Sequence, residues 1–404
     1  MTRRTTLPLL LWGAGRQLFA DDWPQFRGPD GQGHSDEKAL PLTWSETENV
    51  RWKVPVPGRG WSSPAILGDR IWLTTAIEPG PSLRAICLDR DTGRQQQNVE
   101  LFRLTGGEAL NPKSSYATPT PLLEGDRVYL HFGPHGTACI GNSGEIVWRA
   151  RLKYSPEHGP GGSPVLFENL LIVSCDGQDI QYVVALDKET GKVRWKTPRA
   201  GYQAYTTPLV IDAAGRTQLI SPGAHRATSY DPRTGKEIWS VSYGQGFSNV
   251  PRPVFGAGLV FICTGFFEPE VLAVRPDGKG DVTATHIAWT LQRGAPLTPS
   301  PLLVGEDLYV ISDNGVATCL EAATGTPYWR VRFSGNFSAS PVYADGRIYF
   351  LNEEGETTVI APGKHFKKLA TNRLDGTTLA SIAISGGALF IRTDENLYRL
   401  EIGK

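Results

Sequence analysis

The sequence predicts an all-β fold, an eight-bladed β-propeller built from four-stranded antiparallel blades. One repeated element is a tight turn followed by a strand, which occurs as TGKVRWK at Thr190 and in similar form at Ser143, Thr234 and Thr324. A second element, a small residue followed by Pro, a Gly or Asp turn and an alternating strand, recurs along the whole chain. Units of about 40 to 50 residues with four short strands are typical of propeller blades. No long segment shows a helical period, which excludes a solenoid of helix pairs.

The second element gives one anchor position in each of eight units. The anchors are Pro64, Pro121, Pro164, Pro208, Pro253, Pro301, Pro341 and Ile382. Each unit then continues through a tight turn, a second strand, a connector, a third strand, a Thr-Gly-type turn and a fourth strand. The predicted fourth strands often carry Trp, as at Trp148, Trp195, Trp239, Trp289 and Trp329. We expect each indole ring to cover the side of the next blade, because a large flat ring suits a packed strand face.

The two ends of the repeat array predict how the ring closes. The eighth unit stops after its third strand, NLYRLEIGK, whereas VRWKVP at Val50 precedes the first anchor without a blade of its own. We therefore expect Val50 to Val54 to form the fourth strand of the last blade, which removes the unpaired edge at the seam. The predicted organisation is an export signal over residues 1–20, a lead segment over 21–49 and a propeller over 50–404.

The N-terminus has the pattern of an export signal. Arg3 and Arg4 precede an apolar stretch from Leu7 to Trp12, and Ala20 offers a small residue before a cut ahead of Asp21. The arginine pair also resembles a twin-arginine signal, so both the general and the twin-arginine export routes stay open. No later stretch approaches the roughly 20 apolar residues of a spanning helix. We expect a periplasmic or secreted protein, and a monomer.

Charge and cysteine content exclude some classes of function. Lys plus Arg and Asp plus Glu number 41 each, so no net field attracts nucleic acid or an anionic membrane. The five cysteines, Cys87, Cys139, Cys175, Cys263 and Cys319, have no metal-type spacing. Three of them occupy one repeat position, where pairing is unfavourable, and we expect buried thiols. The motifs RPDGKGD at Arg275 and HFGPH at His131 are weak metal signals, and we expect no metal site.

Connector lengths predict which face of the disc binds a ligand. The turns between first and second strands and between third and fourth strands are tight. The longer connectors share the opposite face, where loops are free to vary, so we expect the function on that face. That face should receive Arg59, Trp61, Lys113, Tyr116, His158, Tyr205, His225, Arg226, Asn249, Arg252 and Asn336. It should also receive His131, Asp176, Glu268, Asp313, Glu353 and Asp394. Arg226 and Arg252 are the expected anchors for carboxylates of a partner, because Arg offers a planar fork to such groups.

The small-residue-Pro anchors, the DGRIYF-type strand and the L-D-x-x-T-G-K-x-x-W ending resemble the pyrroloquinoline-quinone-like propeller repeat, over about residues 44 to 404. The same repeat builds quinoprotein alcohol dehydrogenases and the periplasmic propeller of the outer-membrane protein assembly machinery. The dehydrogenases carry two adjacent cysteines beside the quinone and an acidic and amide set for calcium, and this chain has no adjacent Cys pair. The resemblance therefore favours a binding scaffold over an enzyme.

The sequence predicts an exported, non-catalytic propeller that binds an envelope protein or peptide on its loop-rich face, with no cofactor. One alternative is a reduced quinoprotein oxidoreductase that uses pyrroloquinoline quinone and calcium. Another alternative is a polysaccharide-related binding role, and no motif in the sequence supports or opposes it. The motifs describe blade packing, so they specify the fold more closely than the function.

Overall fold

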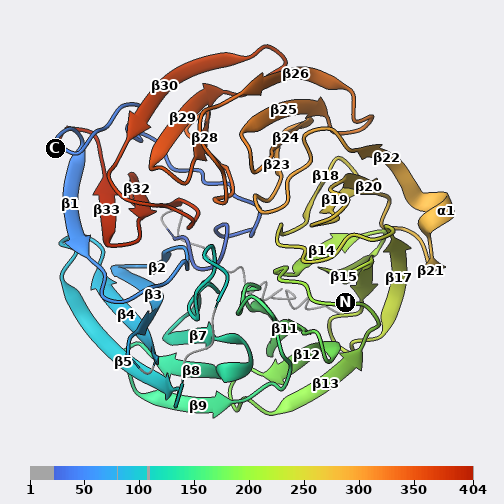
Figure 1. Cartoon of the computed structure of the whole chain (residues 1–404), viewed down its shortest axis with the longest axis horizontal. Coiled ribbons are helices and arrows are strands. Elements are labelled where there is room, and N and C mark those ends of the chain that lie inside the picture. Colours follow the sequence, from blue (N-terminus) through green and yellow to red (C-terminus); the bar gives the residue numbers. More distant parts are fainter. Residues whose placement is uncertain (1–21, 80, 107–109, 404) are drawn as a thin grey trace, which may run out of the picture.

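Residues 22–79, 81–106 and 110–403 are described by the computed structural model, and within them eight sheets surround a common axis (Figure 1). Seven of these sheets have four antiparallel strands, and one has a fifth strand. The predicted eight-bladed propeller is confirmed. The export signal expected over residues 1–20 lies outside the described residues, and no described helix is long and apolar enough to cross a membrane.

The first four blades run from the first anchor to the middle of the chain. Blade 1 contains β2 (Ala65–Leu67), β3 (Arg70–Ile77), β4 (Ser82–Asp89) and β5 (Gln95–Arg103). Blade 2 contains β6 (Leu122–Glu124), β7 (Arg127–His131), the short helix η1 (Gly133–His135), β8 (Thr137–Gly141) and β9 (Ile146–Ala150). Blade 3 contains β10 (Val165–Phe167), β11 (Leu170–Asp176), β12 (Gln181–Asp187) and β13 (Val193–Pro198). Blade 4 contains β14 (Leu209–Ala213), β15 (Arg216–Pro222), β16 (Arg226–Tyr230) and β17 (Glu237–Ser242).

The last four blades complete the circle. Blade 5 contains β18 (Val254–Gly256), β19 (Leu259–Cys263), β20 (Val271–Val274) and β22 (Ile287–Leu291). Blade 6 contains β23 (Leu302–Val304), β24 (Asp307–Ile311), β25 (Val316–Glu321) and β26 (Pro327–Arg332). Blade 7 contains β27 (Val342–Ala344), β28 (Arg347–Leu351), β29 (Glu356–Ala361) and β30 (Lys367–Arg373). Blade 8 contains β31 (Ala383–Ser385), β32 (Ala388–Arg392), β33 (Asn396–Leu400) and β1 (Val50–Pro55).

The ring closes as the sequence predicts. Strand β1 pairs antiparallel with β33, with Val54 opposite Leu397, and Figure 1 shows the blue strand β1 beside the red β33 at the seam. Val50, Trp52 and Val54 pack against a buried cluster shared by blades 7, 8 and 1. An N-terminal strand thus completes the sheet that the C-terminus leaves unfinished.

The hydrophobic core lies between the blades. Each buried cluster joins strands of neighbouring sheets, as where Tyr129 of blade 2 packs with Leu171 and Val173 of blade 3. Strands buried on both faces explain the continuous apolar runs of β11 and β24, since both sides of each sheet contact another blade. The five cysteines belong to this core as free, buried thiols, which confirms the predicted burial.

The lead segment crosses the face of the disc that carries the tight turns. Trp23 pairs with Ile66 through two backbone hydrogen bonds. Leu40 O accepts a 3.0 Å hydrogen bond from Arg347, and the Glu37 carboxylate accepts hydrogen bonds from the backbone of Gly386 and Gly387. The lead segment therefore covers part of the face that carries the tight turns.

The RPDGKGD motif lies in an insertion of blade 5, between β20 and β22. Its end forms β21 (Gly280–Asp281), which pairs parallel with β17 and extends blade 4. Helix α1 (Thr283–His286) then leads into β22. The insertion changes the role of Trp239, whose indole donates to Gln218 Oε1 of its own blade at 2.7 Å instead of reaching the next blade.

Candidate functional site

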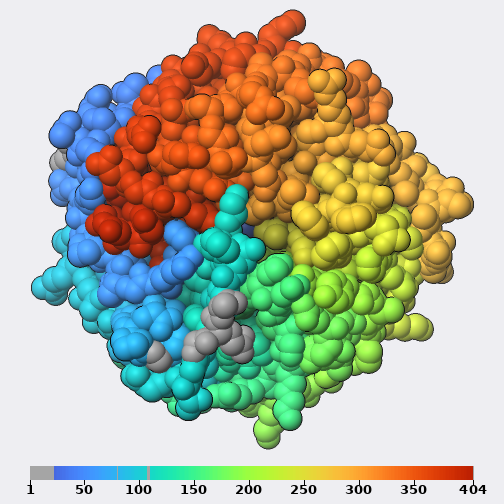
Figure 2. All heavy atoms as spheres, in the orientation of Figure 1, coloured from blue at the N-terminus to red at the C-terminus, as the bar shows by residue number. Residues whose placement is uncertain are grey.

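An axial funnel opens on the face that carries the longer connectors. Its volume is about 620 Å³, and all eight blades contribute to its wall. Figure 2 shows this face of the molecule, with a hollow near its centre. Five of the residues that the sequence predicts for this face line the funnel, namely Trp61, Lys113, His158, Tyr205 and Asp313.

A ring of hydroxyl groups surrounds the axis, and six of its members line the funnel. The residue before each anchor is Ser or Thr in seven blades, namely Ser63, Thr120, Ser163, Thr207, Ser300, Ser340 and Ser381. The backbone N–H of one member donates to the hydroxyl of the next, as from Ser63 to Thr120 at 3.0 Å and from Ser381 to Ser63 at 3.0 Å. These bonds satisfy backbone N–H groups near the axis, where no neighbouring strand offers them an acceptor. The Ser or Thr of the small-residue-Pro pattern therefore links neighbouring blades by hydrogen bonds near the axis.

Arg252 occupies the eighth position of this ring, and its placement corrects the sequence-based hypothesis. Its side chain is buried, its Nε donates to Pro208 O at 3.2 Å, and a terminal nitrogen donates to Phe26 O at 2.7 Å. The guanidinium thus holds the lead segment beneath the funnel and is not accessible to a partner. The expectation that Arg252 anchors carboxylates at the mouth is wrong for this reason.

The lead segment supplies the floor of the funnel. Phe26 lines the cavity from below. The adjacent Arg27 is fully buried and donates to Gln32 O at 2.6 Å and Pro301 O at 2.7 Å. The axial channel is therefore closed on the turn face, and a ligand would enter from the connector face only.

Two polar atoms on the funnel wall have no hydrogen-bond partner within the described residues. Trp61 Nε1 and Gln203 Oε1 are buried in this way, although the two side chains are 8% and 1% exposed. An unpaired buried donor or acceptor costs free energy unless a ligand or water supplies the missing partner. The wall can therefore accept one hydrogen bond from a ligand and donate another.

His158 and Tyr205 form an aromatic wall beside these atoms, with ring centroids 6.0 Å apart. The Tyr205 hydroxyl accepts a 3.3 Å hydrogen bond from the His158 backbone N–H. Burial raises the pKa of Tyr205 above its usual range, so its hydroxyl stays protonated and can donate to a ligand. Nearby, hydrogen bonds from Gln203 and Gln178 lower the pKa of the Glu157 carboxyl.

An ion pair spans the mouth of the funnel. Lys113 Nζ, on the connector into blade 2, lies 2.6 Å from Glu353 Oε1 of blade 7. Ser338 also donates to that carboxylate oxygen at 2.6 Å. Beside them, Arg59 donates to Pro112 O at 2.6 Å and lies 5.9 Å from the centre of the Trp61 ring. The connector from blade 1 to blade 2 therefore extends over part of the opening.

An exposed aromatic cluster stands on the rim of the funnel, and the sequence analysis did not find it. We call it the aromatic ridge: Tyr202, Phe247, Phe266 and Phe267, whose successive ring centroids lie 5.7, 5.6 and 6.4 Å apart. Backbone hydrogen bonds between Phe247 and Phe266 hold two connectors together. Phe266 and Phe267 are 53% and 67% exposed. The adjacent Phe-Phe pair in a connector was the only sequence signal for this ridge.

Four other nominated residues lie away from the funnel wall. Asn249 is buried, and its Nδ2 donates to Cys263 O at 3.0 Å. Tyr116 is buried, with its ring edge-on to another aromatic residue. His225 is partly exposed, and Arg226 lies 2.6 Å from Glu237 on the outer part of blade 4. Their positions give Asn249 and Tyr116 packing roles.

The remaining nominated residues follow the same division. Asn336 is exposed, and its backbone N–H faces the Glu354 carboxylate. Asp176 and His131 are buried, although both stand on connector-face strand ends. Asp176 forms an ion pair with Arg199. Connector-face residues are therefore divided between the funnel and the interior, and sequence position does not distinguish the two groups.

A quinone with calcium does not fit the funnel. No Cys occurs among the described residues of its wall. Its carboxylate Asp313 already accepts hydrogen bonds from the backbone of Leu297 and Thr298, and Glu157 from glutamine side chains. Within the described ranges, no three His, Cys, Asp or Glu side chains are grouped to hold a metal ion.

Comparisons with known proteins agree with the propeller fold. The outer membrane protein assembly factor BamB of Shewanella oneidensis is 26% identical over an alignment of 216 residues, and the match covers 48% of this chain and 51% of that protein. The match thus spans about half the length of this relative. The crystal structure of BamB from Moraxella catarrhalis aligns with a TM-score of 0.62 at 12% identity, over 87% of this chain and 99% of that chain.

Enzymes share the fold as well. A europium-containing methanol dehydrogenase aligns with a TM-score of 0.71 at 10% identity, over 93% of this chain and 90% of that chain. Quinohemoprotein alcohol dehydrogenase from Comamonas testosteroni aligns with a TM-score of 0.68 at 10% identity, over 95% and 81% of the two chains. At such identities these likenesses show the fold alone. The family model described as outer membrane protein assembly factor BamB matches residues 135–216 and 223–379, more than half of the sequence, and the chain therefore belongs to this family of pyrroloquinoline-quinone-like propellers.

Proposed function

We propose that this protein is a periplasmic, non-catalytic scaffold that binds an envelope protein through its connector face. The observation that carries the proposal is the aromatic ridge, where Phe266 and Phe267 are more than half exposed. Membership of the assembly-factor family supports a scaffolding role for the chain. A protein of the outer membrane or its assembly machinery is the partner class that this family implies.

The ridge has the physical properties of a protein-binding anchor. Burial of exposed phenylalanine rings against a partner is favourable by about 25 cal/mol per Å² of apolar area, and a cluster of such rings marks an interaction site. Phe267 also has a φ of 85°, a left-handed conformation that is strained for a bulky residue. Strain and exposure together at one residue indicate a functional constraint, because packing of the blade requires neither.

Polar groups surround the ridge and complete an interface of the usual composition. The Lys113 to Glu353 ion pair and the Trp61 and Gln203 atoms without partners lie across the adjoining funnel. Interfaces commonly combine a few buried aromatic anchors with a polar rim that fixes orientation. The funnel would accept a polar segment of the partner, while the ridge would supply most of the binding free energy.

Position-specific photo-cross-linking in cells tests this proposal. A photoreactive phenylalanine analogue at position 267 should cross-link one envelope protein that mass spectrometry identifies. The matched control is position 193 on the outer strand β13, because Val193 is also apolar and 56% exposed. Cross-linking at position 193 and none at position 267 would contradict the proposal.

Binding of the purified partner then measures the contribution of the ridge. The variant F266S/F267S should bind at least about tenfold more weakly, which corresponds to about 1.4 kcal/mol. Val193→Ser should bind like the parent protein. Fractionation of cells that express the chain with and without residues 1–20 tests the periplasmic location, since only the longer form should leave the cytoplasm.

A further inference from the structure

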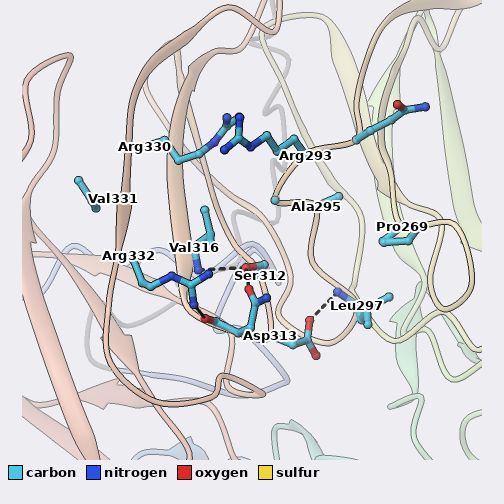
Figure 3. Close-up of a pocket in the computed structure, with 13 residues that line it drawn as sticks. Pro269, Arg293, Ala295, Leu297, Ser312, Asp313, Val316, Arg330, Val331 and Arg332 are labelled. Atoms are coloured by element: carbon cyan, nitrogen blue, oxygen red, sulfur yellow. Dashed lines mark hydrogen bonds between the residues drawn. The ribbon is translucent and has the colours of Figure 1, made fainter.

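A second cavity lies beside the funnel, between the connector from blade 5 to blade 6 and the face of blade 6. Its volume is about 690 Å³. We call it the basic groove, because its wall includes Arg293, Arg330 and Arg332 (Figure 3). Leu297 and Asp313 belong to both cavities, so the groove continues outward from the funnel.

The three arginines converge from two elements. Arg330 and Arg332 are two residues apart on β26, so they share one face of the sheet, opposite Thr318 and Val316 of β25. Arg330 Nε donates to Thr318 Oγ1 at 3.2 Å, and Arg332 donates to Asn314 O at 2.8 Å. Arg293 comes from the connector and lines the same cavity, and Figure 3 shows its side chain and that of Arg330 extending toward each other. Three positive charges therefore line one groove.

No carboxylate neutralises these charges among the described residues. Arg293, Arg330 and Arg332 take part in none of the ion pairs that the described residues form. Asp313 is the carboxylate of the groove wall, and its Oδ2 accepts hydrogen bonds from Leu297 N at 2.7 Å and Thr298 N at 3.2 Å. Like charges in proximity are unfavourable unless an anion lies between them. The arrangement is therefore complementary to a negatively charged ligand.

The rest of the wall indicates what form that ligand takes. Backbone N–H groups that could surround a compact phosphate are already occupied, at Leu297 and Thr298 by Asp313 and at Val316 by Ser312 Oγ at 3.0 Å. The apolar part of the groove wall, here called the floor, consists of Ala295, Leu297 and Val316. Cations from two elements beside an apolar floor suit an elongated ligand whose charges are spaced along it.

We propose that the basic groove binds an extended acidic peptide. In an extended chain, alternate side chains point to the same side, so carboxylates at positions i and i+2 match the spacing of Arg330 and Arg332. Each guanidinium offers a planar fork to a carboxylate. Apolar side chains between the acidic residues would contact the floor of the groove. The inference concerns the groove alone and does not depend on the aromatic ridge.

Fluorescence anisotropy with synthetic peptides tests this inference on the full mature chain. The probe is a labelled ten-residue peptide of alternating Glu and Val, and the comparison peptide replaces Glu with Gln. The acidic peptide should bind at low salt with a Kd below about 1 mM and weaken as salt rises, and the Gln peptide should bind at least about tenfold more weakly. Equal binding of the two peptides would overturn the proposal.

Two double variants with the same change in charge locate the site. R293Q/R330Q should weaken binding of the acidic peptide at least about tenfold. R94Q/R194Q, at exposed positions in blades 1 and 3, should bind like the parent. An equal loss in both variants would show non-specific attraction and overturn the proposal. Single R293Q removes an exposed connector side chain, so it provides the same test if the double variant does not fold.

Inorganic phosphate distinguishes a peptide site from a compact anion site. At equal ionic strength, phosphate and chloride should displace the acidic peptide to the same small extent. If phosphate displaces the peptide at concentrations at which chloride does not, the groove is a phosphate site and the proposal fails. Results for F266S/F267S do not affect this conclusion, because that variant leaves the groove residues unchanged.

Discussion

Trp148 Nε1 donates a 2.9 Å hydrogen bond to the backbone O of Lys188, in the turn between the third and fourth strands of the next blade. Gly191 of the same turn packs against the face of the Trp148 ring. The same bond to the following blade occurs from Trp52, Trp195, Trp289 and Trp329. The repeated Thr-Gly and Trp of the sequence are therefore the two halves of one contact between blades.

Replacement of Gly191 by Ala should destabilise the propeller more than the same change at Gly215. Both glycines have similar backbone angles, with φ of 69° and 71°. A Cβ at Gly191 would lie 2.6 Å from the Trp148 ring, whereas a Cβ at Gly215 would meet nothing within 4 Å. Both variants carry the strain of a left-handed alanine, about 1 kcal/mol, and only G191A adds a steric clash. Urea unfolding should show at least about 1 kcal/mol between them, and equal midpoints would contradict this reading.

Deletion of residues 50–55 should destabilise the whole ring. The change removes the pairing with β33, the packing of Val50, Trp52 and Val54, and the hydrogen bond from Trp52 to Arg90 O. Burial of that apolar area accounts for at least about 3 kcal/mol. Thermal unfolding followed by circular dichroism measures the effect. An unchanged melting temperature would mean that the ring does not depend on this strand for closure.

Arg252→Met should lower the free energy of unfolding more than Arg226→Met does. Arg252 is buried and donates to Pro208 O and Phe26 O, and the substitution leaves these carbonyl groups without a partner. Loss of hydrogen bonds from a charged group costs about 1.5 to 3 kcal/mol. Arg226 forms a partly exposed pair with Glu237, which contributes about 1 kcal/mol or less. Chemical unfolding compares the two, and limited proteolysis should cut the lead segment faster in R252M only.

His131 should make the fold less stable in acid. Burial lowers the pKa of His131 to about 3, and its ring nitrogens lie 2.9 Å from Thr137 Oγ1 and 3.2 Å from Tyr154 Oη. In the unfolded chain a histidine titrates near about 6.5. Between these two pKa values the unfolded state binds a proton that the folded state does not. This group's contribution to stability therefore falls as pH falls from about 6.5 to about 3, by up to about 1.4 kcal/mol per pH unit.

The variant His131→Gln measures this contribution. Gln does not titrate, so the free energy of unfolding of the variant should depend less steeply on pH between about 6 and 4. The exposed His365→Gln is the matched control and should keep the slope of the parent. The comparison uses slopes, because the substitution also changes packing at every pH. A variant slope equal to that of the parent would contradict the assignment.

The sequence by itself determined the number of blades, the order of their strands and the closure by β1. Those features follow from local patterns, because each blade repeats the same turns and strands within one unit, and an incomplete last unit requires a strand from elsewhere. Connector length also predicted the open face and five residues of the funnel wall, Trp61, Lys113, His158, Tyr205 and Asp313. A local sequence pattern is enough to predict a feature that is formed by residues close together in the chain.

Only the tertiary structure decided how far each side chain lies from the axis. Arg252 and Arg226 are the same residue type and were both predicted for the connector face, yet Arg252 is buried beside the lead segment and Arg226 is partly exposed beside Glu237. Arg293 and Arg330 line one groove because the connector from blade 5 to blade 6 lies against blade 6. Depth and proximity depend on the diameter of the ring and on the segments that cover it. No local sequence pattern specifies those distances, because they arise from contacts between residues far apart in the chain.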